Sequence, residues 1–343
     1  MKDLTKGKPS SLILSFAFPI FLANLLQLTY SLADTRIVGS FLGEDALAAV
    51  GSTSTVSNLI IGFLLGLANG FAIITAQRFG AKDIKGMKKS FAASILLGTG
   101  ISIVLTVLGM IFKNTLLGFL NVPHNLYGEA GAYIFIIIAG MTATFLYDSC
   151  AAVLRSLGDT ITPLIILLVS VALNITGDLF FVVVLKSGVR GAAIATVLAQ
   201  IIAFVICFVY MFKKYEILRL TKSDFTALDG NLVRNMLGSG LSMGFMSSLV
   251  NIGSLTLQTA INKLGQDIIV AHTAARKISE MFMIMFTVFG QTMATYCGQN
   301  MGAGRIDRVK AGIKSALIYT CSWCVLTVIA SYTIGDWLIY LVT

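Results

Sequence analysis

The sequence predicts an all-α polytopic membrane protein, and two observations support this. Of its 343 residues, 56% are hydrophobic and only 12% are charged, and the mean hydropathy is +0.87. A helix needs about 20 mostly apolar residues to cross a bilayer, and runs of this kind follow one another along the chain. Lipid offers the backbone no hydrogen-bond partners, so we expect these runs to be helices and not isolated strands.

Nine apolar runs are long enough to be expected spans, and the apolar ending WLIYLVT is a candidate start for a tenth. The basic start and apolar run of residues 1–33 superficially match a secretory signal. The apolar part is about 20 residues long and Asp34 follows it, which favours an uncleaved first span. The expected spans cover about 12–33, 46–76, 90–112, 128–154, 161–185, 189–212, 233–262, 268–297 and 312–333.

The basic residues are distributed unevenly between alternate loops. One set of alternate loops holds 18 of the 25 lysines and arginines, an asymmetry typical of cytoplasmic loops. We therefore expect a plasma (inner) membrane protein with a cytoplasmic N-terminus. The net charge of +9 then reflects membrane topology and not nucleic-acid binding. The set is Lys2, Lys6, Lys8, Arg78, Lys82, Lys85, Lys88, Lys89, Arg155, Lys213, Lys214, Arg219, Lys222, Arg234, Arg305, Arg308, Lys310 and Lys314.

An internal repeat runs across the long polar segment at 213–231. "GEDALAAVG" at 43–51 matches "GQDIIVAHT" at 265–273, and "AQRFGAKDIKGMKKS" at 76–90 matches "GQNMGAGRIDRVKAG" at 298–312. Both pairs have the same offset of 222 residues, without a gap. The offset spans six expected helices, an even number, so corresponding helices point the same way. This predicts two lobes related by a parallel repeat, as in many secondary transporters.

The repeat also predicts the domain organisation. Residues 1–212 would form an N-lobe of six transmembrane helices, and residues 213–232 a cytoplasmic loop between lobes. Residues 233–343 would form a partial C-lobe of three helices and the start of a fourth. A complete second lobe would need six helices, so the chain is expected to be either a fragment or a truncated relative.

Several polar side chains stand inside the apolar runs. Asn174 and Asp178 lie near the middle of "ITPLIILLVSVALNITGDLFFVVVL" and, four residues apart, share one helix face. An ionised carboxylate in a bilayer costs roughly 2.5–3.5 kcal/mol or more, which favours a functional role. Asp34 ends the first run, and Thr196 and Gln200 share a face of the sixth span. Converging oxygen donors suit a hard cation or a shared proton.

Structural interpretations remain open for two of the acids. Asp34 stands near Arg36 and would be a solvated, paired residue if it lay at the outer interface. Asp148, in "FLYDSC", has Arg155 seven residues further on, which favours a structural ion pair.

The second lobe offers weaker candidates for a substrate cleft. Glu280 is a candidate for a cleft carboxylate in this lobe, but an ion pair with Arg276 at the i,i+4 spacing explains its presence equally well. Met281 and Met285, in "SEMFMIMF", are adaptable side chains that suit a drug-binding surface, although packing against lipid or core is the more common role.

Patterns typical of enzymes are weak. "GLSMG" at 240–244 fits G-x-S-x-G, but a nucleophile elbow needs a strand before it, and this match lies in an expected membrane helix. The sequence lacks the nucleotide-binding pattern G-x-x-x-x-G-K-[ST]. We therefore expect a protein that is not an enzyme and uses no cofactor, and whose transport is driven by an ion gradient.

The segments "LADTRIVG", "ALAAVG", "AQRFGAKD", "LRSLGDTITP", "NITGDLFF", "GAAIATVLAQ" and "GQNMGAGRID" together resemble the multidrug and toxic compound extrusion (MATE) transporters. The resemblance implies twelve helices in two lobes of six, so this chain would lack the last helices. It implies export of cationic or amphipathic drugs in exchange for Na⁺ or H⁺, by a protein that is a monomer. It places the coupling-ion site at Asp34, Asn174, Asp178 and Thr196.

Departures from the family pattern restrict the possible mechanism. Another branch of the family uses acids on the seventh and tenth helices, but residues 236–262 contain none. Coupling is therefore expected in the N-lobe. Two alternatives stay open: a flippase for lipid-linked precursors from the same superfamily, and a truncated membrane protein without transport activity. The flippase would need basic residues in its cleft, whereas the basic residues here are expected mostly in loops.

Overall fold

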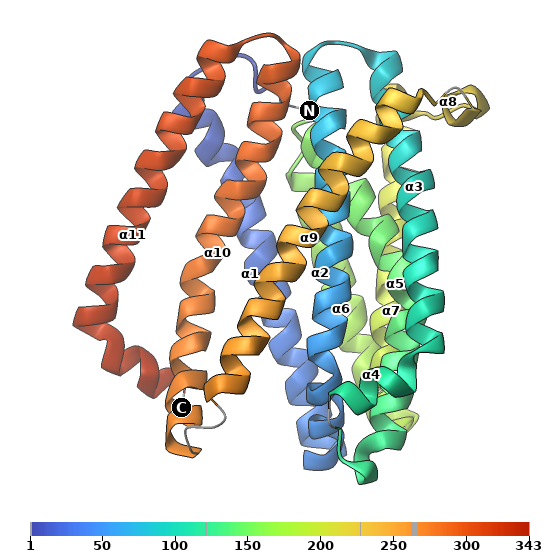
Figure 1. Cartoon of the computed structure of the whole chain (residues 1–343), viewed down its shortest axis with the longest axis vertical. Coiled ribbons are helices and arrows are strands. Elements are labelled where there is room, and N and C mark those ends of the chain that lie inside the picture. Colours follow the sequence, from blue (N-terminus) through green and yellow to red (C-terminus); the bar gives the residue numbers. More distant parts are fainter. Residues whose placement is uncertain (1, 121, 227, 262–265, 343) are drawn as a thin grey trace.

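The computed structural model describes residues 2–342 apart from 121, 227 and 262–265, and every regular element in this part is helical (Figure 1). Three short helical turns join the longer helices: η1 (His124–Leu126), η2 (Leu179–Val184) and η3 (Glu216–Leu218). The α-helices are α1 (Pro9–Leu42), α2 (Glu44–Gly80), α3 (Ile84–Ile111), α4 (Lys113–Phe119), α5 (Tyr127–Ser156), α6 (Ile161–Asp178), α7 (Gly188–Lys214), α8 (Lys222–Thr226), α9 (Gly230–Ile261), α10 (Gln266–Gly302) and α11 (Ile306–Val342).

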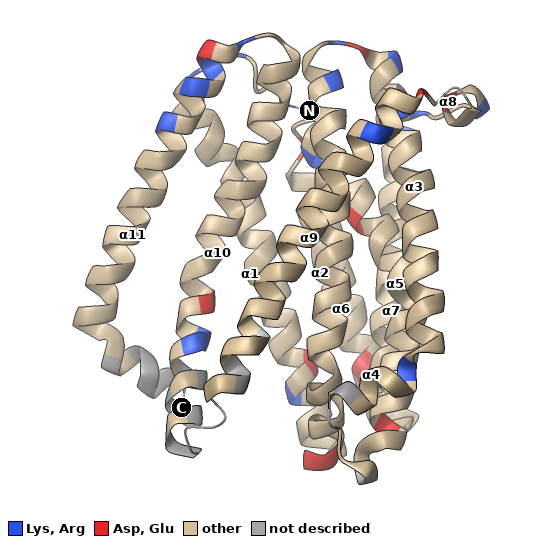
Figure 2. Ribbon diagram, viewed as in Figure 1, with Lys and Arg blue, Asp and Glu red and all other residues tan. Residues whose placement is uncertain are grey.

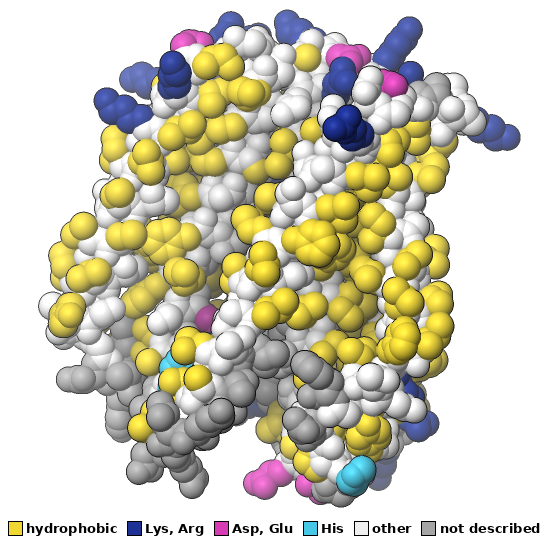
Figure 3. All heavy atoms as spheres, in the orientation of Figure 1, with side chains coloured by type: hydrophobic (Ala, Val, Ile, Leu, Met, Phe, Trp, Pro, Cys, Tyr) yellow, Lys and Arg dark blue, Asp and Glu magenta, His cyan; other side chains and the backbone are white. Residues whose placement is uncertain are grey.

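The long helices agree with the nine expected spans. In the described part, seven helical segments are both long and apolar enough to cross a membrane: α1, α2, α3, α5, α6 with η2, α7 and α11. The helices α9 and α10 are as long as the others. Figure 3 shows hydrophobic side chains spread over the visible face between its two ends, as expected for a surface in contact with lipid.

The tenth helix expected at "WLIYLVT" is not a separate element in the described residues. The helix α11 continues through this segment to Val342. An isolated glycine such as Gly335 is tolerated within a helix, and the segment contains no proline that would end it.

Most lysine and arginine residues lie at one end of the bundle, which we call the basic end (Figure 2). The N-terminus lies there, together with the connections α2–α3, α5–α6, α7–α9 and α10–α11. The alternate loops selected by the charge count are therefore at the same end of the molecule.

The helix boundaries follow the internal repeat. Both ends of α2, Glu44 and Gly80, lie 222 residues before the ends of α10, Gln266 and Gly302, and α3 begins 222 residues before α11. Part of the first matched pair, at Gly265, lies outside the described residues. The agreement is consistent with a parallel repeat, so we refer to α1–α7 as the N-lobe and α9–α11 as the C-lobe.

Glycines bring the two lobes into close contact. A Cβ atom added to Gly66 or Gly70 of α2 would lie 2.5 Å from a backbone oxygen of α9. On the facing helix, Gly240 and Gly244 pack against the phenylalanine side chains Phe71 and Phe63 of α2. Small residues at these positions let the helix backbones approach, so packing accounts for the four-residue glycine spacing.

The N-terminal segment joins the lobes at the basic end. The backbone N–H of Leu4 donates to Oε1 of Gln299 in α10 at 2.9 Å, and Nε2 of Gln299 donates to the carbonyl of Ser156 in α5 at 2.8 Å. Asn300 and Arg308 both donate to the Leu4 carbonyl, each at 3.2 Å. Leu4 itself is 1% exposed. A continuous hydrogen-bonded layer therefore closes the bundle at this end.

Candidate functional site

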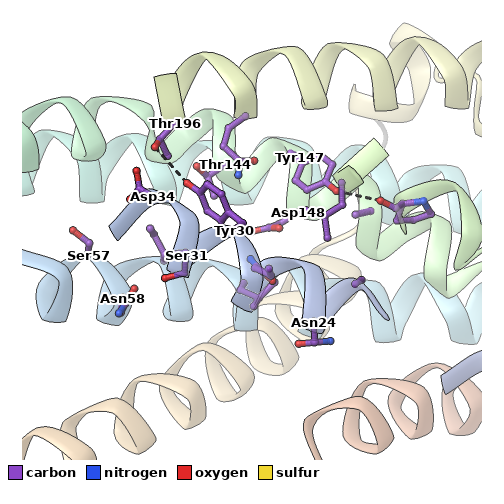
Figure 4. Close-up of a pocket in the computed structure, with 18 of the residues that line it drawn as sticks. Asn24, Tyr30, Ser31, Asp34, Ser57, Asn58, Thr144, Tyr147, Asp148 and Thr196 are labelled. Carbon is purple, nitrogen blue, oxygen red and sulfur yellow. Dashed lines mark hydrogen bonds between the residues drawn. The ribbon is translucent and has the colours of Figure 1, made fainter. Parts of the chain in front are cut away.

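A cavity of about 360 Å³ lies among the N-lobe helices and reaches α10 through Gln291. Its wall comes from α1, α2, α5, α6 and α7, and combines apolar side chains with polar groups that point inward (Figure 4). Such a mixture is typical of small-molecule sites, where apolar walls hold the body of a ligand and a few polar groups orient it.

Four residues predicted from the sequence meet at one side of this cavity. Asp34 comes from α1, Asn174 and Asp178 from α6, and Thr196 from α7. Asp34 and Thr196 line the cavity, while Asn174 and Asp178 are 2% and 0% exposed and lie behind its wall. The carboxyl groups of Asp34 and Asp178 are direct neighbours.

Acceptor oxygens without a donor are concentrated in this cluster. Oδ1 of Asp34, Oδ1 of Asn174 and both carboxylate oxygens of Asp178 are buried and accept no hydrogen bond within the described part of the chain. Two neighbouring carboxylates cannot both be ionised cheaply in a low-dielectric site unless a proton or a cation neutralises them. Such a cluster is therefore chemically suited to a positive charge.

The Thr196 hydroxyl group organises the cluster. It donates to the Ala192 carbonyl at 3.1 Å, and it accepts from Nδ2 of Asn174 at 3.2 Å. The Tyr30 hydroxyl lies 3.3 Å from it (Figure 4). Because the amide nitrogen of Asn174 points to Thr196, its Oδ1 atom is left free as a further acceptor.

Local backbone features place α6 against its neighbours. Asn174 and Asp178 are one helical turn apart, so they lie on the same face. A Cβ atom on Gly177 would lie 3.0 Å from the Ala195 Cβ, so glycine permits the close approach of α7. Directly after Asp178 the chain continues as the π-helical turn η2, a feature that is frequent at functional sites.

The donor set matches a hard cation or a proton. All free acceptors are oxygens, which alkali and alkaline-earth cations prefer over nitrogen or sulfur ligands. In the part of the chain that the structure describes, histidine, cysteine, aspartate and glutamate form no group of three or more that suits a metal ion. The residues present therefore fit Na⁺ or H⁺ better than a transition metal.

The remaining sequence candidates lie in different places. Gln200 lines the cavity, and its Oε1 atom is buried without a partner in the described residues. Glu280 forms an ion pair with Arg276 at 3.1 Å, the i,i+4 arrangement that the sequence left open. Met281 is exposed on the outside of α10, and Met285 packs against the apolar cluster around α1. Glu280, Met281 and Met285 are not among the residues that line this cavity.

The ion pair expected between Asp148 and Arg155 is not formed. No nitrogen of Arg155 lies within 4.0 Å of an Asp148 oxygen, because seven residues separate them by almost two helical turns. Both side chains line the cavity instead.

Other cavity residues were missed by the sequence reasoning. Tyr30, Tyr133, Asn58 and Gln291 all line the wall. Of these, only Tyr30 carried a usable signal, since it stands four residues before Asp34 and therefore on the same helix face.

Comparison with known proteins identifies similar sequences and structures. A sequence model of the MatE family matches residues 19–180 and 242–343. The probable multidrug resistance protein YpnP of Bacillus subtilis (strain 168) is 30% identical over 311 residues, which cover 90% of this chain and 68% of YpnP. The chain thus spans about two thirds of the length of that relative.

Two solved structures share the fold. A MOP superfamily transporter from Pyrococcus furiosus, described as having a binding pocket of reverse polarity that suggests a different function, superposes with a TM-score of 0.92 at 22% identity. The match covers 99% of this chain and 75% of that one. A multidrug resistance MATE family transporter in an outward-facing conformation gives a TM-score of 0.91 at 22% identity, with 99% and 76% covered.

Proposed function

The chain belongs to the MatE family of multidrug efflux transporters, and we propose that it carries the ion-coupling lobe of a secondary active exporter. Its family contains multi-pass membrane transporters and not enzymes. The proposed activity is export of cationic or amphipathic small molecules in exchange for H⁺ or Na⁺. In this proposal the protein lies in the plasma membrane. The basic end faces the cytoplasm, because cytoplasmic loops carry the excess of lysine and arginine.

The neighbouring carboxyl groups of Asp34 and Asp178 carry this proposal. We call Asp34, Asn174, Asp178 and Thr196 the cation cluster. Asp34 belongs to it and also lines the cavity, whereas Asp178 belongs to the cluster alone. An ionised Asp34 would attract a cationic ligand into the cavity. A proton or Na⁺ bound between Asp34 and Asp178 would cancel that attraction, so the coupling ion and the ligand would compete for the same carboxylate.

Competition of this kind supplies the exchange that an antiporter needs. A ligand changes a conformational equilibrium only as far as it binds one state better than the other. The bound ion and the bound ligand would each stabilise a different arrangement of the charged cluster. The two lobes would alternate between the conformations that go with these two arrangements. Asn174 and Thr196 would complete the oxygen shell of Na⁺, or hold the carboxyl groups in place when a proton is shared.

The flippase alternative finds one observation in its favour. Arg155, which the sequence placed in a loop, lines the cavity as a basic residue. The same wall carries the acids Asp34 and Asp148, so the wall is not the basic surface that a pyrophosphate-bearing lipid would require. A lipid-scrambling assay in vesicles tests this alternative, and scrambling without dye transport would favour it.

Substitution of Asp178 by asparagine tests the coupling-ion site. The variant keeps the size of the side chain but cannot be ionised. We expect ethidium to bind the wild-type chain in nanodiscs more weakly as Na⁺ or acid is added, by about fivefold or more, the lower end of typical coupling between sites. The variant should lose this ion dependence. Comparing Na⁺ with acid at constant ionic strength identifies the coupling ion.

The matched control is Asp45→Asn, an exposed acid at the start of α2. It should retain the ion dependence of the wild type. Equal ion dependence in the two variants would refute the assignment of Asp178. Retained secondary structure and a single size-exclusion peak would show that the variant is folded.

A further inference from the structure

Three sulfur atoms meet between α5 and α7, outside the cavity. Cys150 belongs to α5, and Cys207 and Met211 lie one helical turn apart on α7. All three side chains are at most 1% exposed and belong to one buried cluster. None of them lines the cavity. We call these three residues the sulfur cluster, and the proposed transport function makes no use of it.

The spacing of these sulfur atoms suits a metal ion. Sγ of Cys207 lies 4.0 Å from Sδ of Met211, and the Cys150 thiol is the neighbour of the Cys207 thiol across the contact of α5 with α7. Metal–sulfur bonds are about 2.3 Å long, and two such bonds that meet at 120° span about 4.0 Å between their sulfur atoms. A trigonal metal ion therefore fits between these side chains with little movement.

The chemistry of the ligands selects the kind of ion. Thiolate and thioether sulfur are soft ligands, which Cu(I) prefers, whereas Mg²⁺ and Ca²⁺ prefer oxygen. Structural zinc sites are almost always tetrahedral with four nitrogen, sulfur or oxygen ligands, and the sulfur cluster supplies three sulfur atoms. Thiols and thioethers also pack well as apolar side chains, but packing alone does not require two thiols from different helices to meet beside a thioether.

We propose that Cys150, Cys207 and Met211 form a binding site for one Cu(I) ion. On binding, each thiol releases its proton to solvent, and the ion forms one bond to each thiolate and one to the thioether. The oxidation state of the metal does not change. The bound ion joins α5 to α7 and stabilises the N-lobe. This inference goes beyond the transport proposal and does not depend on it.

A basic residue near the sulfur cluster balances its charge. Cu(I) with two thiolates has a net charge of −1, and a buried charge needs an opposite charge nearby. The Arg155 guanidinium of α5 is close enough to interact with the Cys207 sulfur and with Asp148. It forms no ion pair with Asp148 within 4.0 Å, so its charge is available to both groups.

The sulfur cluster lies in the half of the N-lobe nearer the basic end. Cys150 stands six residues before the end of α5, and Cys207 stands seven before the end of α7, which places both about 10 Å from those ends at 1.5 Å per residue. Tyr147 and Ala151 pack with the sulfur cluster and also line the cavity. An ion in the cavity is therefore one layer of side chains away from the sulfur atoms.

Competition for Cu(I) with a chromogenic chelator tests the site. The full chain is placed in nanodiscs without oxygen, and Cys297, Cys321 and Cys324 of α10 and α11 are replaced by alanine so that only the two thiols of the sulfur cluster remain. We expect this chain to take up one Cu(I) ion and to melt at a higher temperature with the ion bound. Zn(II) should bind more weakly.

Further variants identify the ligands. Cys150→Ala with Cys207→Ala should remove the bound ion and the rise in melting temperature. Met211→Leu should weaken binding about tenfold, the lower end of the loss seen when a group around a metal is removed. The matched control is Met141→Leu, a methionine of α5 that is buried in a different cluster, and it should bind Cu(I) as tightly as its parent.

X-ray absorption on the chain that keeps both thiols gives a readout that does not depend on folding of the variants. Sulfur atoms alone should surround the copper. Nitrogen or oxygen neighbours would overturn the inference, as would the absence of a bound ion, equal affinity for Zn(II), or an ion retained by the double alanine variant. Equal binding by the Met211 and Met141 variants would show that the thioether is not a ligand and would refute the three-sulfur site.

Discussion

The crossing of α2 and α10 at the basic end allows only glycine at two related positions. A Cβ atom on Gly80 would lie 1.9 Å from the backbone oxygen of Gln299, and one on Gly302 would lie 1.8 Å from that of Gln77. The two contacts are related by the 222-residue repeat: the glycine of each helix packs against the backbone of the glutamine in the other helix. Replacing Gly302 by alanine should force the helices apart.

The cost of this substitution follows from the geometry. Ordinary contacts of a Cβ atom begin at 3.4 Å, so the helices would have to separate by about 1.6 Å at this point. The obstacle is a backbone carbonyl, which cannot rotate away as a side chain does. Overpacking of this kind costs about 1–3 kcal/mol. If the cost falls only on the closed arrangement of the basic end, it favours an open one by roughly fivefold to more than a hundredfold.

Distances between spin labels at Lys85 and Lys310 measure the opening directly. Both side chains are exposed, at the starts of α3 and α11. All five cysteines are free, so they can be replaced without breaking a disulfide. We expect Gly302→Ala to add a longer-distance population in double electron–electron resonance.

The matched control is Gly290→Ala in the same helix, where an added Cβ atom meets nothing within 4 Å. That change should leave the distances unchanged and slightly favour the helix, because alanine has the higher helix propensity. Identical distance distributions and melting temperatures in the two variants would show that the α2–α10 contact is not as tight as the structure has it.

Two other substitutions test the layer that closes the basic end. Gln299→Ala removes the hydrogen bonds to Leu4 and Ser156 and should lower the free energy of unfolding by about 1–3 kcal/mol, the cost of unpaired buried groups. Hydrogen exchange of the Leu4 amide should become faster. An unchanged exchange rate would contradict this role of Gln299. For Asp159, burial acts to raise the pKa, but side-chain and backbone hydrogen bonds from Thr162 hold it below its usual value. A carboxyl group whose pKa is lowered in the folded state contributes stability that is present at neutral pH and lost in acid. The melting temperature of Asp159→Asn should therefore lie below that of wild type at pH 7 and approach it as the pH decreases. A difference that stays constant with pH would refute the argument.

The fold could be predicted from the sequence because the bilayer restricts the choice of structures. Apolar runs of sufficient length must be helical, and the charge asymmetry correctly grouped the loops at one end. The helix ends were less accurate: the first span was expected at 12–33, but α1 covers Pro9–Leu42. Hydropathy marks the part of a helix inside lipid, whereas hydrogen bonding continues the helix beyond it.

The convergence of Asp34, Asn174, Asp178 and Thr196 was also predictable, since costly polar residues in apolar runs are visible in the sequence. Their role in binding a cation stays a prediction. The position of Asp148 and Arg155 in the cavity wall was not predicted. Arg155 was counted as a loop residue because hydropathy ends the span near it, yet it belongs to the last turn of α5 and faces the cavity. Likewise, the contact of Leu4 with Gln299 joins residues almost 300 positions apart, and no local pattern reports such pairing.

The helix α1 is the element through which the cation cluster and the lobe junction would be coupled. Its first half, including Phe16 and Ile20, packs in an apolar cluster with Phe289 and Tyr296 of α10. Its second half carries Asp34 against α6 and α7. Pro19 lies within the first half, between Phe16 and Ile20, and lacks the N–H that a regular helix would use, so bending is least costly there. Neutralising Asp34 would change the forces on the second half alone, and the first half would pass any resulting tilt to α10. Because α1 contacts both lobes and bends most easily at one point, it would transmit the effect of ion binding to the opening of the basic end.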